Sequence, residues 1–590
     1  MHLKRTNYCG TLTEQEIGKE VVVCGWVQRQ RDLGQLIFVD LRDRSGIIQL
    51  AFSDTTDRAI FEKAFLLRAE YVVAAKGIVK ERSAKNPELP TGSIEIEVTE
   101  LELLSKAETP PFEIVKDSKV KEETRLKYRY LDLRREDVQD KIVARHKIVK
   151  VARDYFDDNG FLEIETPILI KSTPEGARDY LVPSRVFPGH FFALPQSPQL
   201  YKQLTMLAGF DRYMQIARCF RDEDLRADRQ PEFTQIDLEM SFVDQEDVMK
   251  VAEGFLKRVY REVLGITLPE TFQRMPYSEA MRRFGSDKPD LRFSMELVDL
   301  SGILKQTGFR VFSSAIAGGG SVRGINVVGG ASRMTRKEID KLSDFVKDYG
   351  AKGLAFTKIS EDGTSSSSFE KFLSEEEVTA LRGELGAQNG DLLFIVASEK
   401  NSVVFDSLGA LRCFLAKKLD LIEKDKPAVL WVTDFPLFEF DEEENRFVAK
   451  HHPFTHPAEE DLSKLESDPG SVRAMAYDLV LNGNEVGGGS IRINNPELQK
   501  RMLWALGFSE KEAEERFGFL IDAFRYGAPP HGGMAFGLDR LVMLMTGCES
   551  IRDVIAFPKV ASSGELMTAA PGTVDQKQLE ELSILVIEQK

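Results

Sequence analysis

Hydrophobic and polar positions alternate in short runs over the first hundred residues of the chain. In the last of these runs, Ile94, Ile96 and Val98 alternate with two glutamates, which is typical of a strand with one buried face. A helical stretch near 57–67 lies between the third run and the fourth. Five strands with this helix predict a small OB-fold β-barrel. We expect the strands at 21–27, 36–41, 47–52, 71–79 and 94–98.

The pattern changes after the breaker Thr109-Pro110-Pro111 and a charged stretch that ends in Arg134-Arg135. From Lys141 onward apolar residues recur at helical spacing, and Asn159-Gly160 predicts the end of that helix. Alternation over 162–165 then predicts a strand. We therefore place a linker between the barrel and a second, mixed domain.

The pattern of apolar and polar residues changes once more between Ser286 and Pro427. Within this segment we expect a helix over 335–349, a strand over 392–397 and a flexible tip at the serine-rich run 363–368. Because the strand-rich pattern resumes afterwards, the sequence indicates one domain split by an inserted α/β domain. The expected boundaries are 1–107 for the barrel, 108–135 for the linker, 136–286 and 427–590 for the split domain, and 287–426 for the insertion.

Composition is that of an ordinary globular protein, with 42% hydrophobic and 29% charged residues in 590. A formal net charge of −16 repels a polyanion at long range, so a nucleic-acid partner would have to be held by local basic and aromatic groups. No run resembles a signal peptide or a membrane span, which predicts a cytoplasmic protein with no membrane partner. The five scattered cysteines argue against disulfides and zinc, and we expect buried, reduced thiols.

The densest charged cluster runs from Arg218 to Glu239. On an extended segment Arg221 and Glu223 project to the same face, where the cation can pair a phosphate and the carboxylate can accept from an amine. Phe233 offers a ring on which a base can stack. The alternative is a solvated, salt-bridged hairpin, which is the usual explanation of a charge run.

Two glycine-rich segments near the C-terminus carry further candidates. Gly532 to Met545 predicts a strand end that enters an apolar helix, with Arg540 in the first turn, where the helix dipole does not favour a cation. Such a placement suggests an anionic ligand, and the alternative is a surface ion pair. Asp478 and Glu485 lie on apolar strands beside three glycines, a pattern that suits magnesium held near nucleotide phosphates or, alternatively, a tight hairpin with outward acids.

These segments resemble the second and third signature motifs of the class II aminoacyl-tRNA synthetases, and 161–167 with its preceding helix resembles the first. The strings 173–180, 196–202 and 451–455 are similar to the bacterial aspartyl-tRNA synthetase family in particular. The resemblance runs through essentially the whole chain. It implies an antiparallel catalytic sheet of six or seven strands with flanking helices, an anticodon-binding OB barrel, the family's α/β insertion and a homodimer formed through the first motif.

Residue roles follow from this resemblance and not from spacing. Arg221 matches the α-phosphate contact, Glu223 the adenine amine contact, Phe233 the adenine-stacking ring and Arg540 the γ-phosphate contact, so that Arg221 and Arg540 are the expected catalytic residues. Asp478 and Glu485 match Mg²⁺ ligands. The full set of expected ATP contacts is Arg221, Asp222, Glu223, Gln230, Phe233, Glu485, Gly537, Leu538, Asp539 and Arg540.

For aspartate, Lys202 and Arg492 match two cations that grip the side-chain carboxylate, and Asp237 and Gln199 match positions near the ammonium. Two fixed cations suit a short acidic side chain, whereas asparagine would leave them imperfectly paired. For His451 and His452 a purely structural role has nearly equal weight. The expected aspartate-binding set is Glu175, Ser197, Gln199, Lys202, Arg221, Asp237, His451, His452 and Arg492.

In the barrel, Arg31, Phe38 and Gln49 match anticodon contacts, as does Glu97, or Glu95 in a shifted alignment. Stacking rings with arginine and amide donors are how unpaired bases are read, although Phe38 alone fits a core position equally well. The implied reaction is activation of L-aspartate by ATP and transfer to the 3′-hydroxyl of tRNA(Asp). Leu33 and Lys85 resemble the enzymes strict for that tRNA.

Two other functions fit parts of the sequence. A related class II synthetase for asparagine or lysine would share the ATP segments but lack the pairing of Lys202 with Arg492. A non-catalytic RNA-binding protein would keep the barrel and lose the ATP residues, but Arg221, Glu223 and Arg540 are all present. The aspartate-specific enzyme is therefore the favoured hypothesis.

Overall fold

The computed structural model describes residues 2–173, 177–223 and 228–587. The chain forms two compact units, and each is described by itself. The first holds residues 1–146, 225–230 and 546–575. The second holds residues 147–224, 231–545 and 576–590.

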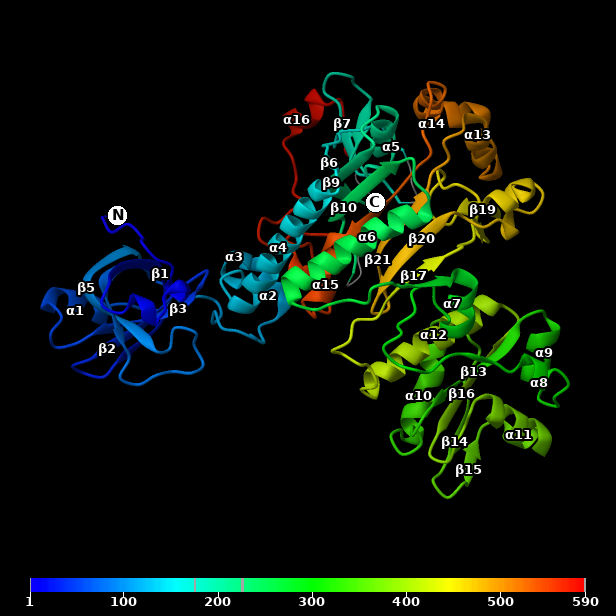
Figure 1. The fold of residues 1–590 in the computed structure, drawn as a ribbon, viewed down its shortest axis with the longest axis horizontal. Helices are drawn as coiled ribbons and strands as arrows, with labels where there is room; N and C mark the ends of the chain where they lie inside the picture. Colours follow the sequence, from blue (N-terminus) through cyan, green and yellow to red (C-terminus); the bar gives the residue numbers. More distant parts are fainter. Residues whose placement is uncertain (1, 174–176, 224–227, 588–590) are drawn as a thin grey trace. The chain divides into compact units, whose positions relative to one another are not determined.

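The first unit begins with a closed five-stranded barrel in the order β1-β2-β3-β5-β4 (Figure 1). Its strands are β1 (Glu20–Asp32), β2 (Ile37–Asp43), β3 (Gly46–Phe52), β4 (Val72–Glu81) and β5 (Ile94–Ser105). Helix α1 (Arg58–Phe65) lies between β3 and β4, and the Asp57 carboxylate caps its N-terminus. Ile94, Ile96 and Val98 are buried as predicted, so the OB-fold prediction is confirmed.

Short helices and the segment 546–575 complete the first unit. They include α2 (Glu122–Lys127), α3 (Arg129–Asp132) and the 3₁₀ helix η7 (Ile551–Val554). The Arg129 guanidinium donates to the carbonyls of Ile555 and Ala556, 2.9 and 2.8 Å away. The buried Asp132 carboxylate accepts from Arg129 and Arg135, so these charges are paired where they leave water.

The second unit is built on an eight-stranded sheet in the order β11-β17-β20-β21-β22-β10-β9-β6. Its inner pairs are antiparallel, and the outermost pairs, β11 with β17 and β6 with β9, are parallel. The antiparallel catalytic sheet is confirmed, but the described strands number eight and not six or seven. They are β6 (Leu162–Glu163), β9 (Arg212–Phe220), β10 (Glu232–Ser241), β11 (Gln273–Pro276), β17 (Val429–Thr433), β20 (Ala476–Leu481), β21 (Asn484–Ile491) and β22 (His531–Gly537).

Helices pack against this sheet because alternate residues of its strands are apolar. The ring of Phe255 in α6 meets that of Phe536 in β22 with 4.9 Å between centroids. The predicted helix before β6 is α4 (Glu136–Asp158), with Phe156 fully buried. The other helices of this part are α5 (Gln199–Leu207), α6 (Gln245–Val259), α7 (Tyr277–Phe284), α13 (Pro496–Ala505), α14 (Glu510–Phe524), α15 (Leu538–Met545) and α16 (Gln576–Glu581).

The inserted segment folds as a five-stranded sheet with helices on both faces (Figure 1). Its strand order is β12 (Val298–Asp299), β13 (Ser321–Val327), β16 (Leu392–Ser398), β14 (Ala355–Ile359) and β15 (Ser365–Ser367). One apolar core lies under α10 (Arg336–Lys347) and α12 (Asn401–Lys418). The other lies under α8 (Ser301–Leu304), α9 (Arg310–Ala317) and α11 (Glu375–Glu384).

Two local predictions for this segment are confirmed and one is wrong. The helix over 335–349 is α10, and the strand over 392–397 is β16. The serine-rich run 363–368 is not a flexible tip, since Ser365–Ser367 pairs with β14. The Ser367 hydroxyl accepts from Thr357 and donates to the Phe356 carbonyl, so the serines satisfy the strand edge with their side chains.

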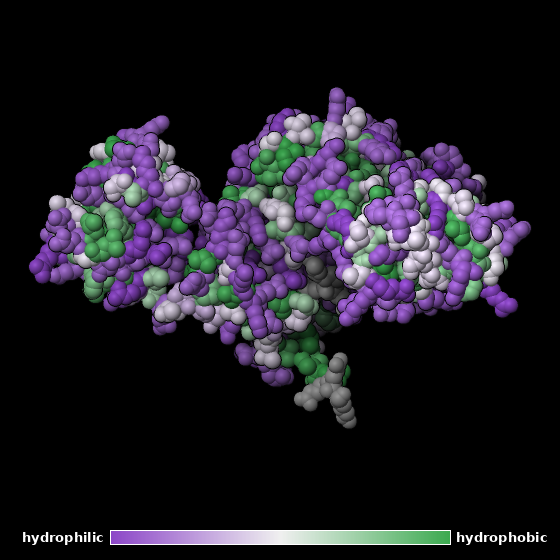
Figure 2. Space-filling view, turned by 90° about the horizontal axis from the view of Figure 1, so that it is seen from below, coloured by the Kyte–Doolittle hydropathy of each residue, from purple (hydrophilic) through white to green (hydrophobic). Residues whose placement is uncertain are grey.

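Polar residues cover most of the face drawn in Figure 2, and apolar residues form separate patches on it. All five cysteines are free, but Cys413 is exposed and Cys548 half-buried, so the prediction of buried thiols is wrong for these two. Among the described helices, none has the length and apolar character that crossing a membrane requires.

Candidate active site on the central sheet

One row of side chains crosses the sheet of the second unit between two acids. Register pairs Asp478 with Gly488, Gly488 with Ala535, and Ala535 with Asp237. Directly paired residues of antiparallel strands point to the same face of a sheet. Because the middle of the row is glycine and alanine, the row leaves open space between its two carboxylates.

A second row on the same face, two residues further along each strand, places Glu239 beside Gly533 and Gly533 beside Ser490. A Cβ atom at Gly533 would lie 2.1 Å from Glu239 Oε2, and one at Gly488 would lie 2.6 Å from Asp478 Oδ1. The glycines are therefore required by the close approach of charged groups. Small residues form the floor of the site, and acids stand at its sides.

Two cations converge on Glu239. Lys202, on α5, places Nζ 3.2 Å from Glu239 Oε2 and 2.6 Å from Asp237 Oδ1. Arg492, just after β21, donates from Nε and Nη2 to the two oxygens of Glu239 over 2.9 and 3.1 Å. All four side chains are at most 3% exposed. The predicted pair of cations is thus brought together, with an anion between them.

The two carboxylates of this group differ in their pKa. Burial alone would raise the pKa of Glu239, but Arg492 and Lys202 lower it to about 2. Burial raises the pKa of Asp237 above its usual value in spite of Lys202. Glu239 is therefore the fixed anion, and Asp237 is the carboxylate whose charge depends on its surroundings.

The two histidines lie at the same site in neutral form. Burial and the neighbouring Lys450 lower the pKa of His451 to about 4, and burial and Arg492 hold the pKa of His452 well below its usual value. His452 Nε2 is 2.6 Å from Arg492 Nη1, which also donates to the Ser490 hydroxyl over 2.7 Å. His452 therefore helps to fix the guanidinium.

Asp478 and Glu485 fit a divalent cation. Burial and the charge of Glu485 hold the pKa of Asp478 well above its usual value, and a cation between the two carboxylates would relieve their repulsion. Gly488 leaves room beside Asp478 Oδ1 and Glu485 Oε1. No group of three or more ligating side chains occurs among the described residues, so a cation held here would need further oxygen ligands from water or a bound nucleotide.

Two arginines flank this region as the sequence predicts. Arg221 follows β9, and its guanidinium carbon lies 5.1 Å from the centre of the Phe233 ring. Arg540 is the third residue of α15 and donates to the Glu485 carbonyl over 2.5 Å. The neighbouring Asp539 accepts from the Thr234 amide over 3.0 Å and so ties α15 to β10. Gly537 ends β22 and Leu538, which begins α15, is buried.

Four buried polar atoms at this site have no hydrogen-bond partner among the described residues: Gln199 Nε2, Arg221 Nε, Asp237 Oδ2 and His451 Nδ1. Buried polar atoms are normally paired, so each exception calls for an explanation. All four belong to residues that the sequence analysis assigned to ATP or to aspartate. They offer donors and acceptors for a small polar ligand.

Other predicted residues lie at the edge of the site or outside it. The Ser197 hydroxyl accepts from the Gln199 amide, and Asp222 and Glu223 follow Arg221 on extended chain. Glu175 lies outside the described residues. Gln230 belongs to the first unit. There its side-chain nitrogen donates to the Lys559 carbonyl, and its side-chain oxygen accepts from the Lys559 amide.

The predicted anticodon residues share one face of the barrel. Gln49 Oε1 accepts from Arg31 and Arg82 over 2.7 and 2.8 Å, and the Arg31 guanidinium lies 5.7 Å from the Phe38 ring centre. Gln49 donates to Glu95, which is its partner in the parallel pairing of β3 with β5. Glu97 pairs instead with Lys80. Glu95 thus bonds Gln49, whereas the strand register places Glu97 in the same row as Ala51, Phe38 and Arg31.

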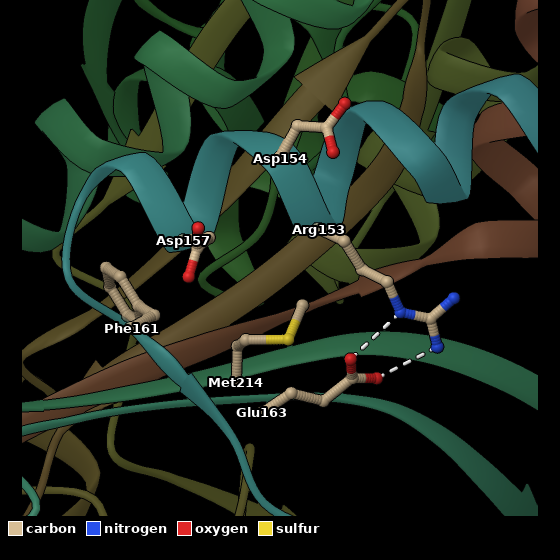
Figure 3. Close-up of a pocket in the computed structure, with 6 residues that line it drawn as sticks. All are labelled: Arg153, Asp154, Asp157, Phe161, Glu163 and Met214. Atoms are coloured by element: carbon tan, nitrogen blue, oxygen red, sulfur yellow. Dashed lines mark hydrogen bonds and ion pairs between the residues drawn. The ribbon is translucent and has the colours of Figure 1, made fainter.

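A separate hollow of about 280 Å³ lies between the end of α4 and β6 (Figure 3). Glu163 accepts from Arg153 Nε and Nη2, both over 2.9 Å. Asp154, Asp157, Phe161 and Met214 complete its lining. It contains none of the predicted substrate residues, and its excess of acids does not suit aspartate or a phosphate.

Glu239 lies at the centre of this site but was not predicted from the sequence. It ends the cluster that contains Arg221, and on a strand it shares the face of Asp237 and Phe233 because all three are an even number of residues apart. That spacing was a usable signal. Its contact with Arg492, more than 250 residues away, was not visible in the sequence.

Comparison with known proteins agrees with this geometry. Residues 121–561 match the family described as tRNA synthetases class II (D, K and N), and residues 21–104 match the OB-fold nucleic acid binding domain family. The first match covers most of the chain, the eight-stranded sheet included. It defines the class to which the sheet and its charged site belong.

Curated relatives and solved structures narrow the class. The Aspartate--tRNA ligase of Ruminiclostridium cellulolyticum is 60% identical over 99% of this chain and 98% of its own length. The Aspartate--tRNA(Asp/Asn) ligase of Caldanaerobacter subterraneus subsp. tengcongensis is 58% identical over the same shares. An asparaginyl-tRNA synthetase structure from Pyrococcus horikoshii shares the fold, with a TM-score of 0.59 and 20% identity over 94% of this chain and 98% of that one. The chain therefore belongs to the class II tRNA synthetases, within the family of aspartate--tRNA ligases.

We predict that Glu239→Ala strongly destabilises the protein. It leaves the buried cations Lys202 and Arg492 without their shared anion, a change that typically costs about 3–5 kcal/mol. Urea unfolding followed by tryptophan fluorescence measures the loss. Glu232→Ala on the same strand is the control, since its partly exposed pair with Arg218 is worth at most about 1 kcal/mol. Equal losses in the two variants would contradict the role of Glu239.

A second prediction concerns pH. The folded-state pKa of His452 is depressed, so its stabilising contribution is complete above the unfolded value of 6.5 and is lost as pH falls below it. The loss amounts to at most about 1.4 kcal/mol per pH unit. Urea unfolding at pH 7.5 and 5.5 should therefore show a smaller drop for His452→Gln than for the wild type. An unchanged drop would show that His452 is not held neutral.

Proposed function

We propose that the chain activates L-aspartate with ATP, forms aspartyl-adenylate and pyrophosphate, and transfers the aspartyl group to the terminal adenosine of tRNA(Asp). The observation that carries the choice of amino acid is the arrangement of Lys202 and Arg492 around Glu239. A substrate carboxylate that reaches these cations finds fixed donors in a buried site. A lysine side chain would meet charges of its own sign there.

The amino acid binds over the small-residue floor. Its side-chain carboxylate contacts Lys202 and Arg492, and its ammonium contacts the unpaired Asp237 Oδ2 and lies near Gln199. Bringing a cation near Asp237 favours the ionised form of a carboxyl group that burial alone disfavours. Lys202 exchanges its bond with Asp237 for one with the substrate carboxylate. Asp237 then becomes available to bond the ammonium.

ATP binds beside the amino acid. Arg221 contacts the α-phosphate, Phe233 stacks on adenine, Glu223 accepts from the adenine amine and Arg540 contacts the γ-phosphate. The aspartate α-carboxylate attacks the α-phosphorus in line, and pyrophosphate leaves. Next the 3′-hydroxyl of the tRNA attacks the mixed anhydride, and AMP leaves. No side chain forms a covalent bond, so positioning and charge neutralisation by Arg221 and Arg540 supply the catalysis.

Mg²⁺ fits the pair Asp478 and Glu485. A cation bound by these two residues would offset the negative charge of the nucleotide phosphates. A cation here would favour the ionised form of Asp478, which burial and the charge of Glu485 disfavour. Arg540, bonded to the Glu485 carbonyl, lies within the same group of residues.

The barrel reads the anticodon through Arg31, Phe38, Gln49 and a glutamate of β5. The Gln49 amide is held by three charged neighbours, which presents a fixed set of donors and acceptors to an unpaired base. Some relatives are named for tRNA(Asp/Asn) and others for tRNA alone. Leu33 is 69% exposed at the end of the β1–β2 face, where the specificity for tRNA(Asp) is proposed to lie.

A second copy of the chain is the proposed partner of the surface around β6. Leu162, Ile168 and Leu169 are about half exposed there, and Leu181 and Phe187 of the neighbouring hairpin are more than half exposed. Apolar side chains in such number along one stretch of chain are typical of an interface. A homodimer through this stretch and a cytoplasmic location remain predictions.

We predict that Lys202→Leu raises the KM for aspartate at least about 30-fold in aspartate-dependent pyrophosphate exchange, because truncating one partner of a buried charged contact costs about 2 kcal/mol or more. The KM for ATP should change little.

Arg221→Ala, in contrast, should abolish exchange while circular dichroism shows the fold retained.

Lys250→Leu on the exposed side of α6 is the matched control and should leave both constants unchanged. If Lys202→Leu raised the two KM values equally, Lys202 would not act on aspartate. If Arg221→Ala kept exchange, the assignment of the phosphate contact would be wrong.

A further inference from the structure

A short arm of the second unit, residues 177–179, contacts both halves of the proposed site. On one side the Asp222 amide donates to the Arg178 carbonyl over 3.0 Å, in an antiparallel bridge. Asp222 directly follows Arg221. On the other side, Ala177 and Asp179 bond the side chain of Gln196, which lies one residue before Ser197.

The side-chain amide of Gln196 makes three hydrogen bonds to this arm, two from its nitrogen and one to its oxygen. Nε2 donates to the Ala177 carbonyl over 2.8 Å and to Asp179 Oδ1 over 2.5 Å, and Oε1 accepts from the Ala177 amide over 3.3 Å. The side chain is 4% exposed. A buried amide with all its bonds made to one short segment is rigid, and losing it leaves backbone groups unpaired.

The residues on either side of Gln196 contact segments of both proposed subsites, the one for ATP and the one for aspartate. The preceding Pro195 accepts from the Phe220 amide over 2.9 Å, immediately before Arg221. The following residues, Ser197 to Gln199, begin α5, which carries Lys202. A displacement of Asp222 by a bound nucleotide therefore reaches the aspartate contacts through two successive hydrogen-bonded links.

We infer that Gln196 is a positioning residue that couples the ATP and aspartate subsites through the arm 177–179; this rests on the proposed function of those subsites. Gln196 is not one of the proposed substrate contacts, and its side chain bonds Ala177 and Asp179. It holds the arm in the one arrangement that fits both the segment after Arg221 and the turn before α5. Each ligand then binds more tightly when the other is present, by the same factor, since coupling is reciprocal.

The test is calorimetric titration of the full chain with L-aspartate, without nucleotide and with saturating α,β-methylene-ATP and Mg²⁺. In the wild type the nucleotide analogue should lower the Kd for aspartate roughly 5- to 150-fold. In Gln196→Ala and in Gln196→Glu, this ratio should fall to about 1. Gln196→Glu keeps the shape of the side chain but loses both donors and faces Asp179, so it separates coupling from packing.

Arg178→Ala is the matched control. The bridge uses the Arg178 backbone, and its side chain is 80% exposed with Nε 3.5 Å from Asp222, so the ratio should match that of the wild type. A ratio within twofold of the wild type in both Gln196 variants, or no coupling in the wild type, would overturn the inference. If the wild type failed to bind aspartate at all, the proposed function itself would fail, which is a different result.

Discussion

The buried carboxylate of Glu239 is the constraint on which the rest of the site depends. Two cations at most 3% exposed cannot stand side by side without a counter-ion, because the cost of removing each from water is several kcal/mol. Glu239 supplies that counter-ion and accepts from Arg492 through both oxygens. It lets the protein keep both cations buried at the place proposed for the carboxylate of the substrate.

The sheet provides the geometry that this arrangement needs. Its register places Gly533 beside Glu239 and Gly488 beside Asp478, so the glycines give space at the points where charged groups come closest. Asp237 and Asp478, the acids proposed for the ammonium and for a metal, then lie at opposite ends of one row. Arg221 and Arg540, at the ends of neighbouring elements, supply charge where phosphates would lie. The site is thus a property of several strands and not of one motif.

Local sequence patterns predicted the elements better than the site. Alternation in 94–98 and helical spacing from Lys141 predict β5 and α4 because each pattern is set by its own buried face. The strand Ser365–Ser367 could not be predicted, since serine hydroxyls there replace the apolar side chains that normally signal a strand. The resemblance supplied Lys202 and Arg492, but the register that brings them to Glu239 is fixed by pairing between strands far apart in the sequence.

The central claim is that this neutralised pair of cations selects a short acidic side chain. Pyrophosphate exchange by the wild-type protein with aspartate and with asparagine tests it most directly. The account predicts a kcat/KM for aspartate about 10⁴-fold higher, because an amide leaves a buried cation imperfectly paired. Exchange with asparagine within about tenfold of that with aspartate would contradict it.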